Sequence, residues 1–260
     1  MNEPDFSGVS HQRLSTIAVI GGGGAMGTML RERLAVLGKT ALCLERPLAG
    51  AEFERAMAQA DMVILSVPAT AMEETVAACA PFMRPGAVLS DVTSVKMVPM
   101  DVMLAGYDGP VIGTHPLFGP VIPEGFTPRV AVTPGPGADP GPLCALLAAM
   151  GFVPFLAEAR DHDRAMAFVQ GLNFTSTVAH LAAMRQVKDI ENYVTPSFLR
   201  RLESSRKMLT QDQQLFETIS EANPLLQETV RQFTQFLNIA AGGDLDLLAD
   251  HARWWWRNDE

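Results

Sequence analysis

The chain has 260 residues, of which 48% are hydrophobic and 19% charged, a balance that excludes disorder and provides core material for one large or two modest domains. Its net charge of −9 at pH 7 excludes the basic surface with which proteins neutralise the phosphates of a nucleic acid. The sequence has no uninterrupted apolar stretch suited to a signal peptide or a membrane span, and its three cysteines form no CxxC pair. We therefore expect a cytoplasmic protein with no metal site and no membrane partner.

Short apolar runs that end at glycine or proline alternate with helical segments in the first part of the chain. The runs predict buried strands at residues 16–20, 41–44, 62–67, 87–92, 111–114, 130–133 and 152–156. Helices are predicted between them, at residues 25–37, 53–59, 71–83 and 143–150. Because strands that alternate with helices are typical of βαβ units, we expect an α/β fold with a mostly parallel, Rossmann-type sheet in residues 1–157.

After residue 158 glycine becomes rare, and apolar residues recur at helical spacing. Helices are predicted at residues 162–187 and 225–241, with a break at Asn223-Pro224 between them. We expect residues 158–260 to form an all-helical domain that binds substrate and builds a homodimer. The tryptophans at 254–256 form an aromatic cluster that predicts either an intramolecular core or part of that interface.

A glycine-rich loop joins the first predicted strand to the first predicted helix. Its sequence, GGGAMG, satisfies the dinucleotide-binding motif G-x-G-x-x-G, and the strand–loop–helix context gives this short motif its meaning. Gly22 would make the tight turn, Gly24 would let the backbone approach a pyrophosphate, and Gly27 would let helix and strand pack closely. The N–H groups that open the helix, at Ala25 and Met26, would face the phosphates.

Two further strand ends should adjoin the cofactor. Glu45 ends the second strand, where a carboxylate accepts hydrogen bonds from ribose hydroxyls and repels a 2′-phosphate, so NAD is favoured over NADP. The adjacent Arg46 leaves NADP open, because its guanidinium could bind that phosphate. Val67 and Pro68 follow the third strand and would lie beside the cofactor at the carboxyl edge of the sheet.

Two polar motifs end later strands, DVTSVK at residues 91–96 and GTHPLFGP at residues 113–120. Both should open on the sheet edge that holds the cofactor. His115, between a strand and a proline, is well placed to act on a hydroxyl during hydride transfer. The alternative interpretation is a hydrogen-bonded turn residue without a catalytic role.

The TSVK and HPLFG motifs, on a Rossmann half followed by a helical half, resemble those of the prephenate dehydrogenase family. The resemblance continues downstream at DHD (161–163), Met166, Gln170, Thr195-Pro196 and LTQD (209–212). It implies a monofunctional enzyme of tyrosine biosynthesis, without a fused chorismate mutase or regulatory domain. The implied reaction is the NAD-dependent oxidative decarboxylation of prephenate to 4-hydroxyphenylpyruvate, in which hydride leaves the carbon that carries the ring hydroxyl.

The resemblance also assigns catalytic roles in the first domain. His115 would accept a hydrogen bond from the ring hydroxyl and must be neutral to do so. Ser94 would hold either His115 or the hydroxyl. Lys96 would either support its own loop or steady substrate charge.

Substrate-binding residues are implied in the helical domain. His162 and Gln170 would shape the substrate pocket, although a structural cap formed with Asp163 also fits His162. The family's carboxylate-binding arginine corresponds to Lys207, so we expect either Lys207 or the adjacent Arg206 to bind a substrate carboxylate. Two earlier arginines, Arg200 and Arg201, are further candidates.

Other functions stay open at this point. Arogenate could be the substrate, because Pro120 and Val121 stand where the family often has an acidic or hydroxyl residue. A different two-domain dehydrogenase, such as a 3-hydroxyacid dehydrogenase or an imine reductase, would account for the glycine loop but for neither TSVK nor HPLFG. A redox-sensing protein that holds NAD without turnover would need the loop but not His115.

Overall fold

The computed structural model describes residues 8–257, apart from the side chains of residues 214 and 215, and its contacts divide the chain into two compact units. The first, Met1–Asp163, contains the sheet, and the second, Arg164–Glu260, is helical. The sequence places the boundary after residue 157, whereas the structure keeps residues 158–163 with the sheet, because His162 and Asp163 are bonded to residues of that unit. No helix among the described residues is long and apolar enough to cross a membrane.

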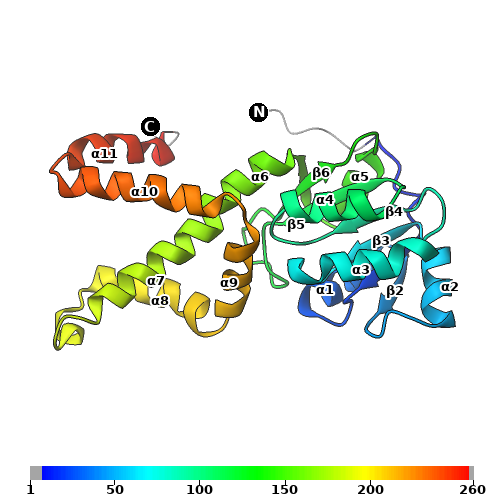
Figure 1. The fold of residues 1–260 in the computed structure, drawn as a ribbon, viewed down its shortest axis with the longest axis horizontal. Helices are drawn as coiled ribbons and strands as arrows, with labels where there is room; N and C mark the ends of the chain where they lie inside the picture. The colour runs from blue at the N-terminus through cyan, green and yellow to red at the C-terminus, as the bar shows by residue number, and fades with distance from the viewer. Residues whose placement is uncertain (1–7, 258–260) are drawn as a thin grey trace. The chain divides into compact units, whose positions relative to one another are not determined.

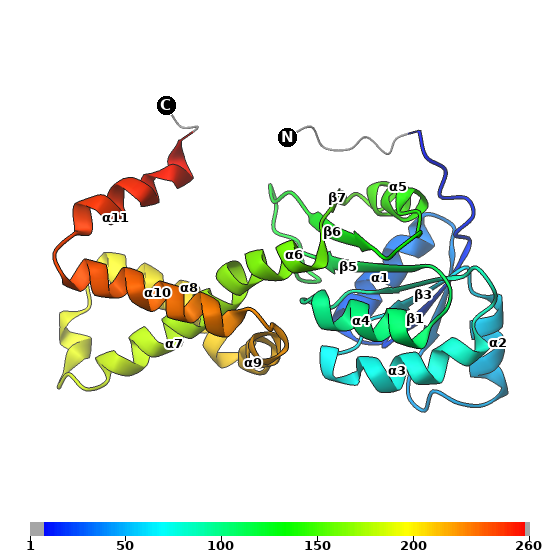
Figure 2. The same ribbon diagram turned by 45° about the horizontal axis from the view of Figure 1, so that its top comes forward.

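The first unit is built on one sheet of seven strands in the order β2-β1-β3-β4-β5-β6-β7 (Figures 1 and 2). The strands are β1 Thr16–Ile20, β2 Thr40–Leu44, β3 Met62–Leu65, β4 Val88–Asp91, β5 Val111–Pro116, β6 Arg129–Pro134 and β7 Val153–Leu156. Neighbours are parallel except β5 and β6, which confirms the mostly parallel α/β fold. From β1 the chain passes to β2 on one side and then to β3 on the other, and Rossmann-type sheets bind ligands at such a reversal.

Helices cover both faces of this sheet, which explains why its strands are continuous apolar runs. The helices are α1 Ala25–Val36, α2 Ala51–Gln59, α3 Met72–Cys79, α4 Met97–Gly106 and α5 Gly141–Ala149. Residues of α1 and α5 share one core cluster with Ile17 and Val19 of β1. Residues of α2, α3 and α4 share a second cluster with Ala18 and Ile20. Successive residues of β1 therefore enter opposite cores, and the strand ends between two buried layers.

Helix α4 is missing from the elements that the sequence predicts. It carries Pro99 in its first turn, and its N-cap residue, Lys96, makes no side-chain capping bond. The side chain of Asp163 supplies the cap instead, by accepting hydrogen bonds from the backbone N–H groups of Lys96 at 2.6 Å and Met97 at 2.8 Å. Because the capping residue lies 67 positions beyond Lys96, the local sequence carries no signal for the start of this helix.

The second unit consists of helices, joined to the first through α6 (Ala159–Met166) and a π-helical segment (Ala167–Leu172). The helices are α7 Asn173–Met184, α8 Pro196–Thr210, α9 Gln213–Ala222, α10 Leu226–Ala241 and α11 Leu245–Ala252. The one helix predicted over residues 162–187 is therefore three pieces. The π-helical segment packs on α9 and α10, and a Cβ at Gly171 would come within 2.6 Å of Leu226.

Much of the apolar surface of this second unit is exposed. Side chains of α10 and α11 such as Leu237 and Leu247 are 52% and 56% exposed. The tryptophans at 254–256 are 54–72% exposed, in a 3-10 turn that follows α11. The prediction of an intramolecular aromatic core is therefore wrong, because these rings extend into solvent instead of packing inside the unit.

Candidate active site

The glycine loop lies at the reversal of the sheet, between β1 and α1. A Cβ at Gly27 would come within 2.4 Å of the Gly21 carbonyl oxygen, and one at Gly22 within 2.8 Å of the Cys43 sulfur, so close packing requires both glycines. Gly24 differs, because the nearest atom to a Cβ there is the Gly21 carbonyl oxygen at 3.4 Å, an ordinary contact. Gly24 is exposed, so its backbone is accessible to a ligand, as the motif predicts. Val67 lies against this loop, with its Cγ1 3.4 Å from a Cβ placed on Gly21.

The helix α1 opens at Ala25 without a capping side chain. The N–H groups of its first turn, including those of Ala25 and Met26, have no carbonyl partner within the helix. Such a turn carries a partial positive charge and binds anions such as a pyrophosphate. The loop and the helix start therefore fit a dinucleotide.

Glu45 and Arg46 follow β2 and reach different partners. One carboxylate oxygen of Glu45 accepts a 2.5 Å hydrogen bond from the backbone N–H of Gly23, which places Glu45 on the glycine loop. Arg46 makes a two-pronged ion pair with Glu74 at 2.9 and 3.1 Å, and both side chains are exposed. Arg46 is therefore bound to an acidic side chain, which would compete with a 2′-phosphate for its guanidinium. Pro68 is exposed at the start of the turn after β3.

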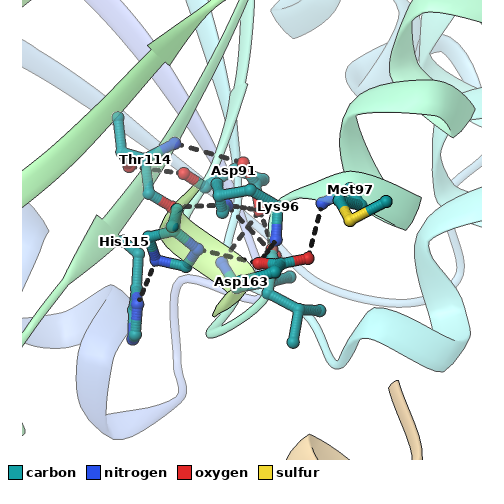
Figure 3. A network of polar contacts seen from close by, with 9 residues as sticks. Asp91, Lys96, Met97, Thr114, His115 and Asp163 are labelled. Carbon is teal, nitrogen blue, oxygen red and sulfur yellow. Dashed lines mark hydrogen bonds and ion pairs between the residues drawn. The ribbon is translucent and has the colours of Figure 1, made fainter. Parts of the chain in front are cut away.

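Lys96 is completely buried, and Figure 3 shows it among Asp91, Thr114 and Asp163. Its ammonium donates to Asp91 at 2.5 Å, to the Thr114 carbonyl at 2.6 Å and to the Thr93 hydroxyl at 3.2 Å. Burial lowers the pKa of Lys96, and the carboxylates of Asp91 and Asp163 oppose that shift. An ammonium has three donors, and all three have acceptors here, so Lys96 ties the strand ends together and has no donor left for another group.

The carboxyl ends of β4 and β5 are thus tied together. Besides Lys96, Asp91 accepts from the backbone N–H of Thr114 at 3.2 Å and from the Thr93 hydroxyl. The Thr114 hydroxyl donates to the Asp91 carbonyl at 2.5 Å. This network fixes the backbone immediately before His115. Sequence reasoning did not assign a role to Asp91, although its place at the start of DVTSVK marked it.

His115 is 3% exposed and is held by His162, not by Ser94. Its Nδ1 lies 2.9 Å from Nε2 of His162, and Nδ1 of His162 lies 2.8 Å from the carboxylate of Asp163. Ser94 is partly exposed, and its hydroxyl has no hydrogen-bond partner within the part of the chain that the structure describes. The prediction that Ser94 holds His115 therefore does not fit the contacts, which leaves Ser94 available to a ligand. Nε2 of His115 likewise has no partner among the described residues.

The surroundings of His115 favour its neutral form. Burial is the largest cause that holds the pKa of His115 well below 6.5. The repulsion that would arise if His115 and His162 were both protonated, and the charge of Lys96, lower it further. A neutral imidazole at pH 7 can accept a proton, so this histidine has the charge state that a general base requires.

The predicted substrate residues of the second unit differ in what they contact. Gln170 lies in the π-helical segment, and its side-chain oxygen is buried without a hydrogen-bond partner in the described structure. On α8, Lys207 is 3.3 Å from Asp212, whereas the exposed guanidinium of Arg206 has no partner among the described residues. Within this unit, Arg206 is therefore the more available of the two cations.

Comparisons with known proteins identify relatives of this chain. The family described as "Prephenate dehydrogenase, nucleotide-binding domain" matches residues 40–126. The T-protein of Enterobacter agglomerans is 30% identical over 242 residues, which cover 89% of this chain and 64% of that protein. The chain spans less than two thirds of the length of the curated relatives that it matches.

Solved structures share the fold over almost the whole chain. The arogenate dehydrogenase of Synechocystis has a TM-score of 0.74 at 22% identity, and the match covers 94% of this chain and 98% of that one. Prephenate dehydrogenase from A. aeolicus, in complex with hydroxyphenyl propionate and NAD+, has a TM-score of 0.73 at 16% identity, with 95% and 98% covered. At these identities the likeness concerns the fold, and both units are included in it.

Proposed function

We infer that this chain, which belongs to the prephenate dehydrogenase family, oxidises and decarboxylates a prephenate-type ring with NAD as hydride acceptor. The proposal rests on the burial, charge and hydrogen bonding of His115. Its ring is buried and neutral, one nitrogen is bound within the protein, and Nε2 is left for a substrate hydroxyl. The residues that tie the strand ends together hold this nitrogen at the sheet edge where the glycine loop opens.

The cofactor site follows from the loop and its neighbours. The backbone at Gly24 and the first turn of α1 would hold the pyrophosphate, with Gly22 and Gly27 giving the loop its shape. Glu45 would hold the ribose hydroxyls, while Val67 and Pro68 would line the cofactor's path along the edge. Arg46 stays paired with Glu74, which supports NAD as the cofactor in preference to NADP.

His115 would act as the general base of the reaction. Bound NAD would supply the hydride acceptor. The hydroxyl proton passes to Nε2 of His115 while the hydride leaves the ring carbon that carries this hydroxyl. The bond to the ring carboxylate then breaks, carbon dioxide leaves, and its electron pair enters the ring. The proton returns from His115 to the oxygen, which gives the phenol, so the residue is neutral again after one turnover.

The substrate is a dianion and needs cations and polar groups. Arg206 would bind a substrate carboxylate, because Lys207 is engaged by Asp212. Gln170 offers a buried side-chain oxygen that lacks a donor, and Ser94 offers a hydroxyl that lacks a partner. Arogenate, the amino-acid counterpart of prephenate, is the second candidate substrate, since one structure of this fold is an arogenate dehydrogenase.

We also propose that the second unit pairs with a second copy of the chain. Exposed apolar side chains are concentrated on the packed helices α10 and α11 and on the turn after them, among them Leu237, Leu247 and Trp255. Large exposed apolar surfaces are typical of protein interfaces, and a second copy would bury these side chains.

The three cysteines are free thiols, in keeping with a cytoplasmic protein.

A turnover assay with the purified chain tests the proposal. With NAD and prephenate it should form NADH and 4-hydroxyphenylpyruvate, and arogenate and NADP are tested in parallel. His115→Asn should bind NAD normally and lose about 10²- to 10⁴-fold in rate. The matched control is His251→Asn, at an exposed position of α11, which should keep the rate. Absence of turnover with both rings would refute the function, and a fully active His115→Asn would refute the catalytic residue.

A further inference from the structure

His115, His162 and Asp163 form a buried row of hydrogen bonds, which we call the His–His–Asp triad. The two imidazoles are joined at 2.9 Å, with ring planes inclined by 75°, and His162 is joined to Asp163 at 2.8 Å. The three residues are 3%, 4% and 0% exposed. All three belong to the first unit, and Figure 3 shows the carboxylate of Asp163 beside Met97 at the start of α4.

The direction of these hydrogen bonds follows from Asp163. Its two carboxylate oxygens accept from the backbone N–H groups of Lys96 and Met97, which fixes the side chain and makes both oxygens acceptors. The contact with His162 Nδ1 must then be N–H to oxygen, so Nδ1 of His162 carries a proton. In neutral His162 the other nitrogen, Nε2, carries no proton and presents a lone pair. That lone pair can accept only if Nδ1 of His115 carries the proton.

We propose that His162 is a positioning residue that, held by Asp163, keeps His115 in the tautomer with the proton on Nδ1 and a lone pair on Nε2. The inference rests on the proposed function only for what the lone pair accepts, namely the proton of the substrate hydroxyl. In the opposite tautomer, Nε2 would present an N–H group and could not take that proton. A neutral imidazole without a fixed partner exchanges between the two tautomers, so the catalytic form needs this contact.

The triad also suits the protonated stage of the reaction. When Nε2 of His115 takes up the hydroxyl proton, Nδ1 keeps its own proton and still donates to His162. No hydrogen bond in the triad has to reverse, and the carboxylate of Asp163 stays behind the pair to balance the new charge. A direct contact between His162 and the substrate, which the family resemblance implies, is not needed for this role.

The tautomer can be read directly by ¹⁵N NMR of the histidine rings in the full chain, without substrate. We expect His115 to show a protonated Nδ1 and an unprotonated Nε2 near pH 7. This measurement uses the wild-type protein, so it stands even if a variant fails to fold. A wild-type His115 protonated on Nε2, or exchanging between the two forms, would overturn the proposal.

Two variants separate positioning from packing. In His162→Gln the side-chain oxygen can still accept from Nδ1 of His115, whereas His162→Leu fills the space without an acceptor. The leucine variant should shift His115 toward the Nε2-protonated form and lower kcat roughly 10- to 100-fold with little change in KM. The glutamine variant should keep the wild-type tautomer and recover most of kcat. Equal losses in both variants, or an unchanged tautomer in His162→Leu, would show that His162 only fills space.

The two readouts also separate this inference from the proposed function. If the wild-type tautomer is as expected but neither prephenate nor arogenate is turned over, the function is wrong and the triad stands. If the enzyme turns over and the tautomer is reversed, the function stands and the triad is wrong.

Discussion

Asp163 caps helix α4 by accepting a 2.6 Å hydrogen bond from the backbone N–H of Lys96. One carboxylate thereby secures the start of a helix, orients His162, and sits close to the buried ammonium of Lys96. The cap and the histidine contact share one oxygen of Asp163. The same carboxylate therefore stabilises the start of α4 and orients the histidine that contacts the candidate base, His115.

Removal of the buried ammonium should destabilise the first unit. Lys96→Met leaves the carboxylate of Asp91 buried without its counter-ion, so the free energy of unfolding in urea should fall by about 3–5 kcal/mol. The double variant Lys96→Met/Asp91→Asn removes that charge as well and should recover part of the loss. Lys188→Met, at an exposed lysine, is the control and should stay within about 0.5 kcal/mol. An unaffected Lys96→Met would mean that the ion pair is not needed for folding.

The pH dependence of turnover should reflect the lowered pKa of His115. Catalysis needs the unprotonated imidazole, and because burial lowers its pKa, this form persists below pH 6.5. The acid limb of kcat/KM should therefore lie below pH 6.5, with the rate falling as the pH drops through it. The profile is measured at saturating NAD with stability checked at each pH. An acid limb above pH 6.5 would contradict the environment assigned to His115.

Cofactor choice should depend on the partners of Arg46. Glu74→Gln frees the guanidinium from its ion pair, and Glu45→Ser removes the carboxylate that repels a 2′-phosphate. The double variant should lower the KM for NADP and raise that for NAD, each by about tenfold, or roughly 1.4 kcal/mol. Glu73→Gln, at the exposed neighbouring position, serves as the control and should leave both constants unchanged. If NADP already binds the wild type as well as NAD, the role given to Glu45 is incorrect.

Substrate affinity should distinguish the two cations on α8. Arg206→Gln removes the cation without a partner and should raise the KM for prephenate by about 10- to 100-fold, the value of a charge-assisted hydrogen bond. Lys207→Gln removes a cation already paired with Asp212 and should change KM less than threefold, within the range expected for an exposed ion pair. The KM for NAD is measured alongside and should not move in either variant. The reverse order of effects would assign the carboxylate to Lys207.

The oligomeric state should follow the exposed apolar side chains of the second unit. Light scattering should give the mass of a dimer, and Leu247→Glu/Trp255→Glu should convert it to a monomer by placing charges on the apolar surface. Val36→Glu, at an 86% exposed valine of α1, should leave the dimer intact. A wild-type monomer would remove the basis for the second copy.

The local sequence is sufficient to predict much of the secondary structure of the first unit and several of its candidate site residues. The apolar run at 16–20 and the glycines after it predict a strand, a loop and a helix, because each step depends on residues that are adjacent in sequence. His115 could be singled out in the same way, from a strand end followed by proline. Glu45 is another local prediction, and the structure places it on the glycine loop.

Only the tertiary structure determines which residues are buried together and which form hydrogen bonds with one another. The residue that caps helix α4, Asp163, lies 67 positions beyond Lys96, so the residues near Lys96 do not predict the start of this helix. From the sequence, Lys96 could either support its own loop or steady substrate charge, and only the tertiary structure shows that it is buried against Asp91. The partner of His115 is His162, 47 positions later, and not the nearby Ser94. Sequence patterns report which residue types recur along the chain, whereas the protonation and tautomer of a buried histidine depend on the groups that folding brings within hydrogen-bond distance.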